Sequence, residues 1–231
     1  MPQYFADIKP TEFFLNDAEA HHAAVVARHK EGDVIRVFDG TGKQYMGKIT
    51  KIQKKFVRGT LLNPCEVRRV PLNLTLAFVP NSRTGLEEVL DKGTQLGVAA
   101  FLPLISARSE YDVLKKYDGK NDRWNQIMVS ACKQCDTPFI PHILPPVKFA
   151  QAIAQTAPSL LAYEAEHTHT LAWGMEQLKN PTTVRVYIGP AGGWAPEEVA
   201  LAQSNGILPV TLGVNILRAE TACIAAAAKL L

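Results

Sequence analysis

Short apolar runs that alternate with polar residues fill the N-terminal part of the chain, up to about residue 70. Alternation with a period of two predicts strands that bury one face, and Asp39-Gly40 between two such runs predicts a hairpin turn. We therefore predict a small β-rich unit over residues 1–70, with a linker between Pro64 and Pro71. Its predicted elements are a helix at 17–27 and strands at 34–38, 45–52 and 56–62.

From residue 72 onward, runs of buried character alternate with helical patterns. Leu86, Val89, Leu90 and Leu96 recur at helical spacing, which predicts one apolar helix face. Strands and helices in alternation are typical of a parallel sheet covered by helices, so residues 72–231 are predicted to be an α/β domain. The predicted strands are 72–79, 98–105, 160–163, 184–188 and 207–212, and the predicted helices are 85–96, 121–135, 195–205 and 217–231.

Composition narrows the class of protein without naming a function. The 231 residues are 47% hydrophobic and 20% charged, enough for one large domain or two smaller ones. The first residues lack the pattern of a signal peptide, and no apolar run is long enough to span a bilayer. Four cysteines in a chain of this size do not suggest a disulfide framework, so we expect a cytoplasmic protein.

Positive charge is concentrated near the N-terminus. Between Arg28 and Arg69 there are eleven Lys or Arg and four Asp or Glu, although the net charge of the whole chain is only +3. Such a basic segment favours a polyanion partner such as nucleic acid. The alternative is a solvated strand face that uses lysine to block pairing at the sheet edge.

Two glycine-bearing turns near the C-terminus are the strongest candidates for a ligand site. Residues 189–193 and 212–217 each follow a predicted strand and precede a predicted helix. In open α/β sheets ligands bind beyond the carboxyl ends of the strands, where glycine lets the bare backbone approach them. Either turn alone is compatible with an ordinary connection. Neither has the G-x-G-x-x-G fingerprint, which disfavours an oxidoreductase that binds NAD.

Other polar motifs favour structural roles. Cys132-x-x-Cys135 has the spacing of half a zinc site, but it lies in a helical pattern without a second pair, so no metal is predicted. His167-x-His169 and His21-His22 are interpreted as solvated and helical positions. Arg218, by contrast, begins an alanine-rich helix, where a charge is expected to face a cleft.

Several segments together resemble one protein family. Residues 189–193, G-P-A-G-G, resemble its G-P-E-G-G loop, and residues 212–222 match its L-G-x-x-I-L-R-x-E-T-A element throughout. This is the RsmE family of small-subunit ribosomal RNA uridine-N3 methyltransferases, of the SPOUT class, and the resemblance spans essentially the whole chain. The other matching segments are 92–98, 106–109, 131–141, His21-His22, Arg28, Gly32-Asp33 and 37–40.

The resemblance implies a PUA-like β-barrel followed by a SPOUT domain with a deep trefoil knot, a homodimer, and S-adenosylmethionine (SAM) as methyl donor. It also implies that Arg218 is catalytic and stabilises negative charge on the uracil. The implied cofactor-binding residues are Leu161, Glu164, Ile188, Gly189, Pro190, Gly193, Leu212, Gly213, Ile216, Leu217 and Arg218. The candidates for RNA binding are Arg28, Lys43, Arg83, Lys92 and Arg108.

The chain departs from the family pattern at four positions. Ala191, Gln95 and Ala107 stand where the family has glutamate, and Thr137 lies near a usual arginine. These departures keep open the alternative of a catalytically weak RNA-binding module that retains the fold and SAM binding.

Overall fold

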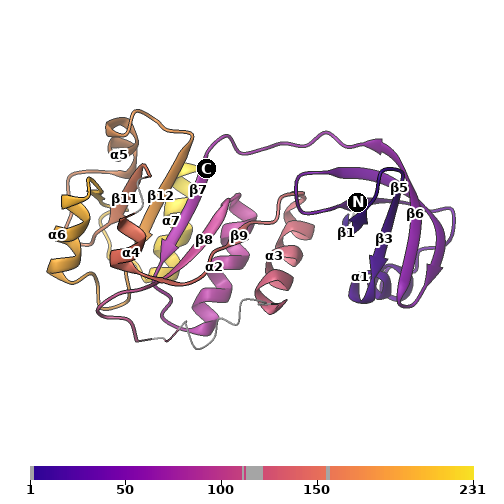
Figure 1. Ribbon diagram of the computed structural model, residues 1–231, viewed down its shortest axis with the longest axis horizontal. Helices are drawn as coiled ribbons and strands as arrows, with labels where there is room; N and C mark the ends of the chain where they lie inside the picture. The colour runs from indigo at the N-terminus through magenta and orange to yellow at the C-terminus, as the bar shows by residue number, and fades with distance from the viewer. Residues whose placement is uncertain (1–2, 111, 113–121, 155–156) are drawn as a thin grey trace. The chain divides into compact units, whose positions relative to one another are not determined.

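The computed structural model describes residues 3–110, 112, 122–154 and 157–231. By its contacts the chain divides into two compact units (Figure 1). The N-terminal unit consists of Met1–Arg69 together with Val129–Ile140, which we call the inserted segment. The C-terminal unit consists of Val70–Met128 and Pro141–Leu231. The domains predicted from the sequence placed the inserted segment in the C-terminal domain, 72–231, whereas its contacts assign it to the N-terminal unit.

The N-terminal unit is built on a six-stranded sheet in the order β1-β4-β5-β6-β3-β2. Strand β1 runs parallel to β4, and the other neighbours are antiparallel. The three strands predicted from alternation are all present, and β5 and β6 are longer than expected. The strands are β1 (Gln3–Phe5), β2 (Asp7–Ile8), β3 (Glu12–Asn16), β4 (Val34–Phe38), β5 (Gln44–Gln53) and β6 (Phe56–Pro64).

The predicted helix of this unit forms in two parts. An α-helix, α1 (Asp17–His21), continues directly as a π-helix, η1 (His22–Val26). Ala20 and Ala23 are fully buried against the sheet core, which explains why small residues occupy these positions.

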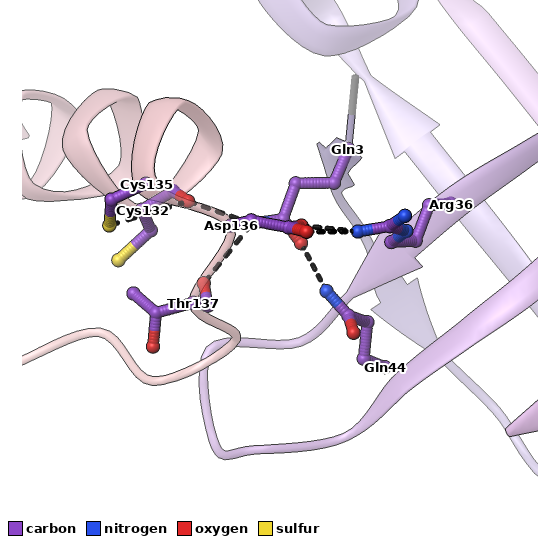
Figure 2. A network of polar contacts seen from close by, with 7 residues as sticks. All are labelled: Gln3, Arg36, Gln44, Cys132, Cys135, Asp136 and Thr137. Atoms are coloured by element: carbon purple, nitrogen blue, oxygen red, sulfur yellow. Dashed lines mark hydrogen bonds and ion pairs between the residues drawn. The ribbon is translucent and has the colours of Figure 1, made fainter. Parts of the chain in front are cut away.

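The inserted segment is fastened to the N-terminal sheet by buried amides (Figure 2). Gln3 donates from Nε2 to the carbonyl of Cys132 at 2.7 Å, and Gln44 donates from Nε2 to Oε1 of Gln3 at 2.7 Å. Arg36 forms an ion pair with Asp136 at the same place. Because both glutamines are almost fully buried, their hydrogen bonds to each other and to this segment satisfy groups that would otherwise be costly to bury.

The C-terminal unit contains a parallel sheet in the order β10-β8-β7-β12-β11-β13, with β9 also paired to β8 (Figure 1). The predicted parallel sheet is therefore confirmed. The short strands β9 and β10 were not predicted, because two residues carry no readable alternation. The strands are β7 (Asn73–Phe78), β8 (Ala100–Ile105), β9 (His142–Ile143), β10 (Val147–Lys148), β11 (Ser159–Ala162), β12 (Thr183–Ile188) and β13 (Leu208–Val210).

Helices cover this sheet as the alternating pattern predicted. Helix α7 packs on β7, β12 and α2, whereas α4 packs on β8 and α6. Helix α2 begins at its N-cap Ser82, whose hydroxyl accepts a hydrogen bond from Gly85, and ends at Gly97 in the left-handed conformation. The helices of this unit are α2 (Arg83–Leu96), α4 (Phe149–Ile153), α5 (Leu171–Gln177), α6 (Pro196–Ser204) and α7 (Ala219–Leu230), and a sixth helix, α3 (Asp122–Cys135), begins in this unit and ends in the inserted segment.

Four of these helices were predicted and two were not. The short α4 and α5 escaped the sequence analysis, and Asn121, the first residue of the predicted helix 121–135, lies outside the described residues. No helix in the described part of the chain is long and apolar enough to cross a membrane.

Candidate functional site

A cavity of about 480 Å³ opens at the carboxyl ends of β11, β12 and β13, entirely within the C-terminal unit. This volume is in the range of sites that hold a small molecule. Three connections form its walls: the first glycine loop (residues 189–193), the second glycine loop (residues 211–217) and the segment that follows β11. The cavity lies where the sequence analysis predicted a ligand crevice.

The first glycine loop is anchored by Trp194. This side chain is 3% exposed, its ring lies 4.5 Å from that of Phe149, and its Nε1 donates to the carbonyl of Ala162 at 3.0 Å. Gly189 lies directly on the indole, since a Cβ built at that position would be only 3.0 Å from the ring. A side chain at Gly189 would therefore require the indole to shift by a few tenths of an ångström.

The other side of the first glycine loop is held by residues that follow two neighbouring strands. Asn81, after β7, accepts the N–H of Ala191 on its Oδ1 at 3.1 Å. Arg108, after β8, donates from Nη1 to the carbonyl of Gly192 at 2.8 Å. The loop is therefore fixed by the ends of β7, β8 and β11, which lie side by side with β12 in the sheet.

The second glycine loop is held mainly by its own residues. Thr211 Oγ1 donates to the carbonyl of Gly213 at 3.0 Å, and Lys229 of α7 donates to the carbonyl of Leu212 at 2.8 Å. Val214 and Ile216 line the cavity, yet they are among the most exposed apolar side chains, at 104% and 82%. This wall therefore presents apolar surface to solvent.

The third wall combines acidic and imidazole groups. Glu164 is the one carboxylate among the described residues that line the cavity, and it lies against Gly193, where a Cβ would collide with it. Nearby, the backbone amides and the side chain of His169, with the amide of Thr168, lower the pKa of Glu166 to about 2. Glu166 is thus a fixed anion that shapes the loop, whereas Glu164 faces the cavity.

The structure brings most of the expected cofactor-binding residues together. Two do not line the cavity: Leu161 is fully buried in the core beneath it, and Arg218 is the exposed N-cap of α7, next to the lining residues Leu217 and Ala219. The expected residues that do line it are Glu164, Ile188, Gly189, Pro190, Gly193, Leu212, Gly213, Ile216 and Leu217.

Two residues that line the cavity were not predicted as site residues from the sequence. His167 was interpreted as solvated, and Thr211 was placed inside the predicted strand 207–212, yet both residues line the cavity. His167 could have been found from its place after a strand whose neighbours carry the glycine loops. Thr211 became a lining residue because β13 ends earlier than predicted, at Val210.

The predicted RNA-binding residues differ in whether their side chains already make polar contacts within the protein, and their role in RNA binding stays a prediction. In the N-terminal unit, Arg28 has no ion pair among the described residues, and Lys43 lies 3.9 Å from Asp39. In the C-terminal unit, the remaining candidates already make polar contacts. These contacts are Arg83 with Glu87 at 2.9 Å, Lys92 with Asp91 at 2.8 Å, and Arg108 with the Gly192 carbonyl.

The Cys132-x-x-Cys135 motif contributes to packing. Cys132 is fully buried and its thiol donates to the carbonyl of Phe139 at 3.3 Å, and burial raises its pKa to about 12. A thiol with so high a pKa is a poor nucleophile and metal ligand. Within the described ranges, no group of three or more His, Cys, Asp or Glu could hold a metal ion.

Comparison with known proteins matches two parts of the chain to known domain families. Residues 68–231 match the family model of the RNA methyltransferase domain, and residues 15–62 match that of the RNA methyltransferase PUA domain. The class that the fold and the cavity define is therefore that of the RNA methyltransferases.

Individual relatives narrow the class to one family. The relative from Synechocystis named ribosomal RNA small subunit methyltransferase E is 31% identical over 223 residues, which cover 94% of this chain and 71% of that protein. The chain belongs to the ribosomal RNA small subunit methyltransferase E family. The resemblance and the fold class inferred from sequence are thereby confirmed, while the trefoil knot stays a prediction.

Two solved structures are similar over nearly the whole chain. The enzyme of this name from Neisseria gonorrhoeae, bound to S-adenosyl methionine, has a TM-score of 0.87 at 28% identity and covers 100% of this chain and 96% of its own. A putative methyltransferase from Legionella pneumophila, in complex with SAM, has a TM-score of 0.86 at 30% identity, with 99% and 95% covered.

Proposed function

We propose that this protein transfers a methyl group from SAM to N3 of a uridine in small-subunit ribosomal RNA. The observation that carries the proposal is the cavity between two glycine loops at the carboxyl ends of the parallel sheet, in a chain of this family. Relatives with the same architecture are bound to SAM.

The residues around the cavity fit a ligand of this kind. Gly189, Gly193 and Gly213 leave backbone groups uncovered by side chains, and Gly193 and Gly213 have positive φ angles of 68° and 149°. Apolar surface from Ile188 and Leu217 suits an adenosyl group, and the carboxylate of Glu164 suits a ligand that carries positive charge. When bound, SAM supplies an activated methyl group on a sulfonium.

Arg218 is the proposed catalytic residue. Uracil N3 carries a proton that must pass to a base or to water so that N3 can take the methyl group and S-adenosylhomocysteine can leave, and negative charge develops on the uracil oxygens as that proton departs. A cation near O2 or O4 stabilises that charge. Arg218 is exposed beside the cavity and has no ion pair among the described residues, so its guanidinium is available to the base.

The N-terminal unit is the proposed RNA-binding part, and the C-terminal unit carries the methyl transfer. The N3 edge is used in base pairing, so the target uridine must be unpaired or flipped out of its helix. We assign phosphate binding first to Arg28 and Lys43 on the basic N-terminal unit. We further propose that the enzyme is a cytoplasmic homodimer.

Mass spectrometry tests the function directly. Small ribosomal subunits that lack the modification are incubated with the protein and SAM, and methylated uridine is located in the digested RNA. We expect one N3-methyluridine, and none without SAM. SAM binding without any product would instead support the RNA-binding module that the four departures from the family pattern left open.

RNA affinity should also respond steeply to salt. Contacts to several phosphates release counterions, so the logarithm of the binding constant falls linearly with the logarithm of the salt concentration. A flat response in a filter-binding titration would contradict the assignment of the basic N-terminal unit to RNA.

A further inference from the structure

We propose that Arg108 is a positioning residue that orders the first glycine loop for the cofactor, and that it is not a phosphate contact. This inference rests on the proposed function, because it takes SAM as the ligand of the loop. It also reassigns a residue that the sequence analysis grouped with the RNA-binding candidates.

The first support is the way the side chain lies on the loop. Its guanidinium donates to the carbonyl of Gly192 at 2.8 Å. Its Cβ and Cδ are both 3.7 Å from the position that a Cβ on Gly192 would take, so the aliphatic stem runs along that glycine. Both the stem and the head of Arg108 are therefore engaged with the same residue of the loop.

The second support is the rigidity of the turn that carries Arg108. The N–H of Ser106 donates to Oγ of Ser109 at 2.8 Å, which closes the turn. Glu198 on α6 accepts the N–H of Ala107 at 2.9 Å on Oε1 and the N–H of Ala195 at 3.0 Å on Oε2. One carboxylate thus joins this turn to the start of the helix that follows the loop.

The third support is that the contacts within the first glycine loop leave two of its backbone groups without a hydrogen-bond partner among the described residues. Asn81 holds the N–H of Ala191, Arg108 holds the carbonyl of Gly192, and Gly193 donates to the carbonyl of Pro190 at 3.0 Å. In the described part of the chain, the carbonyl of Ala191 and the N–H of Gly192 keep no such partner, and both residues line the cavity. The contacts made by Asn81 and Arg108 therefore orient one hydrogen-bond acceptor, the carbonyl of Ala191, and one donor, the N–H of Gly192, that a ligand can use.

These contacts also bear on two of the departures from the family pattern. Ala191 and Ala107 lack the family's glutamate side chains, yet their backbone amides are held by Asn81 and Glu198. The loop is ordered in this chain through its backbone, so the ordering cost is met before the cofactor arrives.

The experiment compares Arg108→Ala, Arg108→Lys and the control Arg123→Ala. Arg123 is an exposed arginine of the same unit that pairs with Glu87, so its removal changes the net charge equally without touching the loop. For each protein we would measure SAM affinity by calorimetry, hydrogen exchange of residues 189–193 without ligand, KM for SAM, kcat, and RNA affinity.

We expect Arg108→Ala to weaken SAM binding about tenfold, the scale of one charge-assisted hydrogen bond. Exchange in residues 189–193 should accelerate and KM for SAM should rise, while kcat at saturating SAM and RNA affinity match those of Arg123→Ala. Arg108→Lys should restore part of the SAM affinity, because an ammonium can donate to the same carbonyl.

Two results would count against different claims. Unchanged exchange and SAM affinity in Arg108→Ala, with RNA affinity below that of Arg123→Ala, would overturn the positioning role and return Arg108 to phosphate binding. A wild-type protein that binds no SAM would overturn the proposed function and the cofactor role with it. The exchange measurement would still report whether Arg108 orders the loop.

Discussion

The two glycine loops face each other across one cavity, but they are held in different ways. The first glycine loop is fixed from outside, by Trp194 in the core and by Asn81 and Arg108 after neighbouring strands. The second glycine loop is held by Thr211 within it and by Lys229 of the following helix, and it exposes Val214 and Ile216.

The difference indicates that the two glycine loops contribute to ligand binding in different ways. A loop with several tertiary contacts is in place before a ligand binds, whereas a loop with exposed apolar side chains gains burial when something covers it. Under the proposed function, the first glycine loop presents fixed backbone groups to SAM. The exposed apolar side chains of the second glycine loop are expected to be covered when the cofactor or the partner of the proposed homodimer binds.

The largest effect should come from removing the anchor of the first loop. Trp194→Ala empties a core position and should lower the free energy of unfolding by about 3–5 kcal/mol, measured by urea denaturation. Trp194→Phe, which keeps a ring but loses the Nε1 hydrogen bond, should cost about 1 kcal/mol. Trp173→Ala is the matched control, since Trp173 is half-buried and stacks on His169 at 3.9 Å. Equal losses of unfolding free energy in Trp194→Ala and Trp173→Ala would contradict the role of Trp194 as the anchor of the first glycine loop.

A change at the end of the second loop should act on chemistry instead of folding. Arg218→Ala is expected to reduce kcat by about 10²–10³-fold, as for loss of one charge-stabilising donor. SAM affinity should change much less, because Arg218 does not line the cavity. Single-turnover rates and calorimetry on the same preparation separate the two effects, and wild-type turnover in the variant would refute the assigned role.

Gly193 tests whether the loop backbone itself is required. Gly193→Ala and Gly206→Ala both place a side chain on a residue with a positive φ angle, 68° and 76°. Each substitution should lower the free energy of unfolding by about 1–2 kcal/mol. A Cβ at Gly206 meets nothing within 4 Å, whereas a Cβ at Gly193 displaces Glu164. Both variants should therefore lose similar stability, and only Gly193→Ala should bind SAM weakly. Similar SAM affinities in the two variants would mean that Glu164 and the loop do not contact the ligand.

The smallest effect on stability is expected at the exposed wall. Replacing Val214 and Ile216 together by serine should change the free energy of unfolding by no more than about 0.5 kcal/mol, because neither is buried in the isolated chain. The double substitution should nevertheless weaken either the proposed homodimer, measured by sedimentation, or the SAM complex, measured by calorimetry. Leu201→Ser, at a half-exposed leucine of α6, is the control that should change neither. If the double variant also behaves like wild type in both assays, the exposed wall has no partner.

Sequence patterns predicted the long elements well because each has its own periodic signal. The alternation in 45–52 and the helical spacing of Leu86, Val89 and Leu90 can be read without knowing their neighbours. The two-residue strand β10 and the seven-residue helix α5 were not predicted, because neither completes enough periods of its own pattern to be read from the sequence. The short strands β1 and β2 were missed for the same reason, and the five-residue β3 was also missed, although it pairs with β6 along its whole length.

The sequence by itself determined the class of sheet, the basic N-terminal segment, the family, and the two glycine turns that become the walls of the cavity. Each of these features is encoded by residues close together in the sequence, as a hydrophobic period, a concentration of charge or a motif. Only the tertiary structure decided that the inserted segment joins the N-terminal unit through Gln3 and Gln44, and that Arg108 holds Gly192. Those contacts join residues between 41 and 129 positions apart. A hydrogen bond over such a separation depends on how strands are ordered in a sheet, and no local pattern encodes that order.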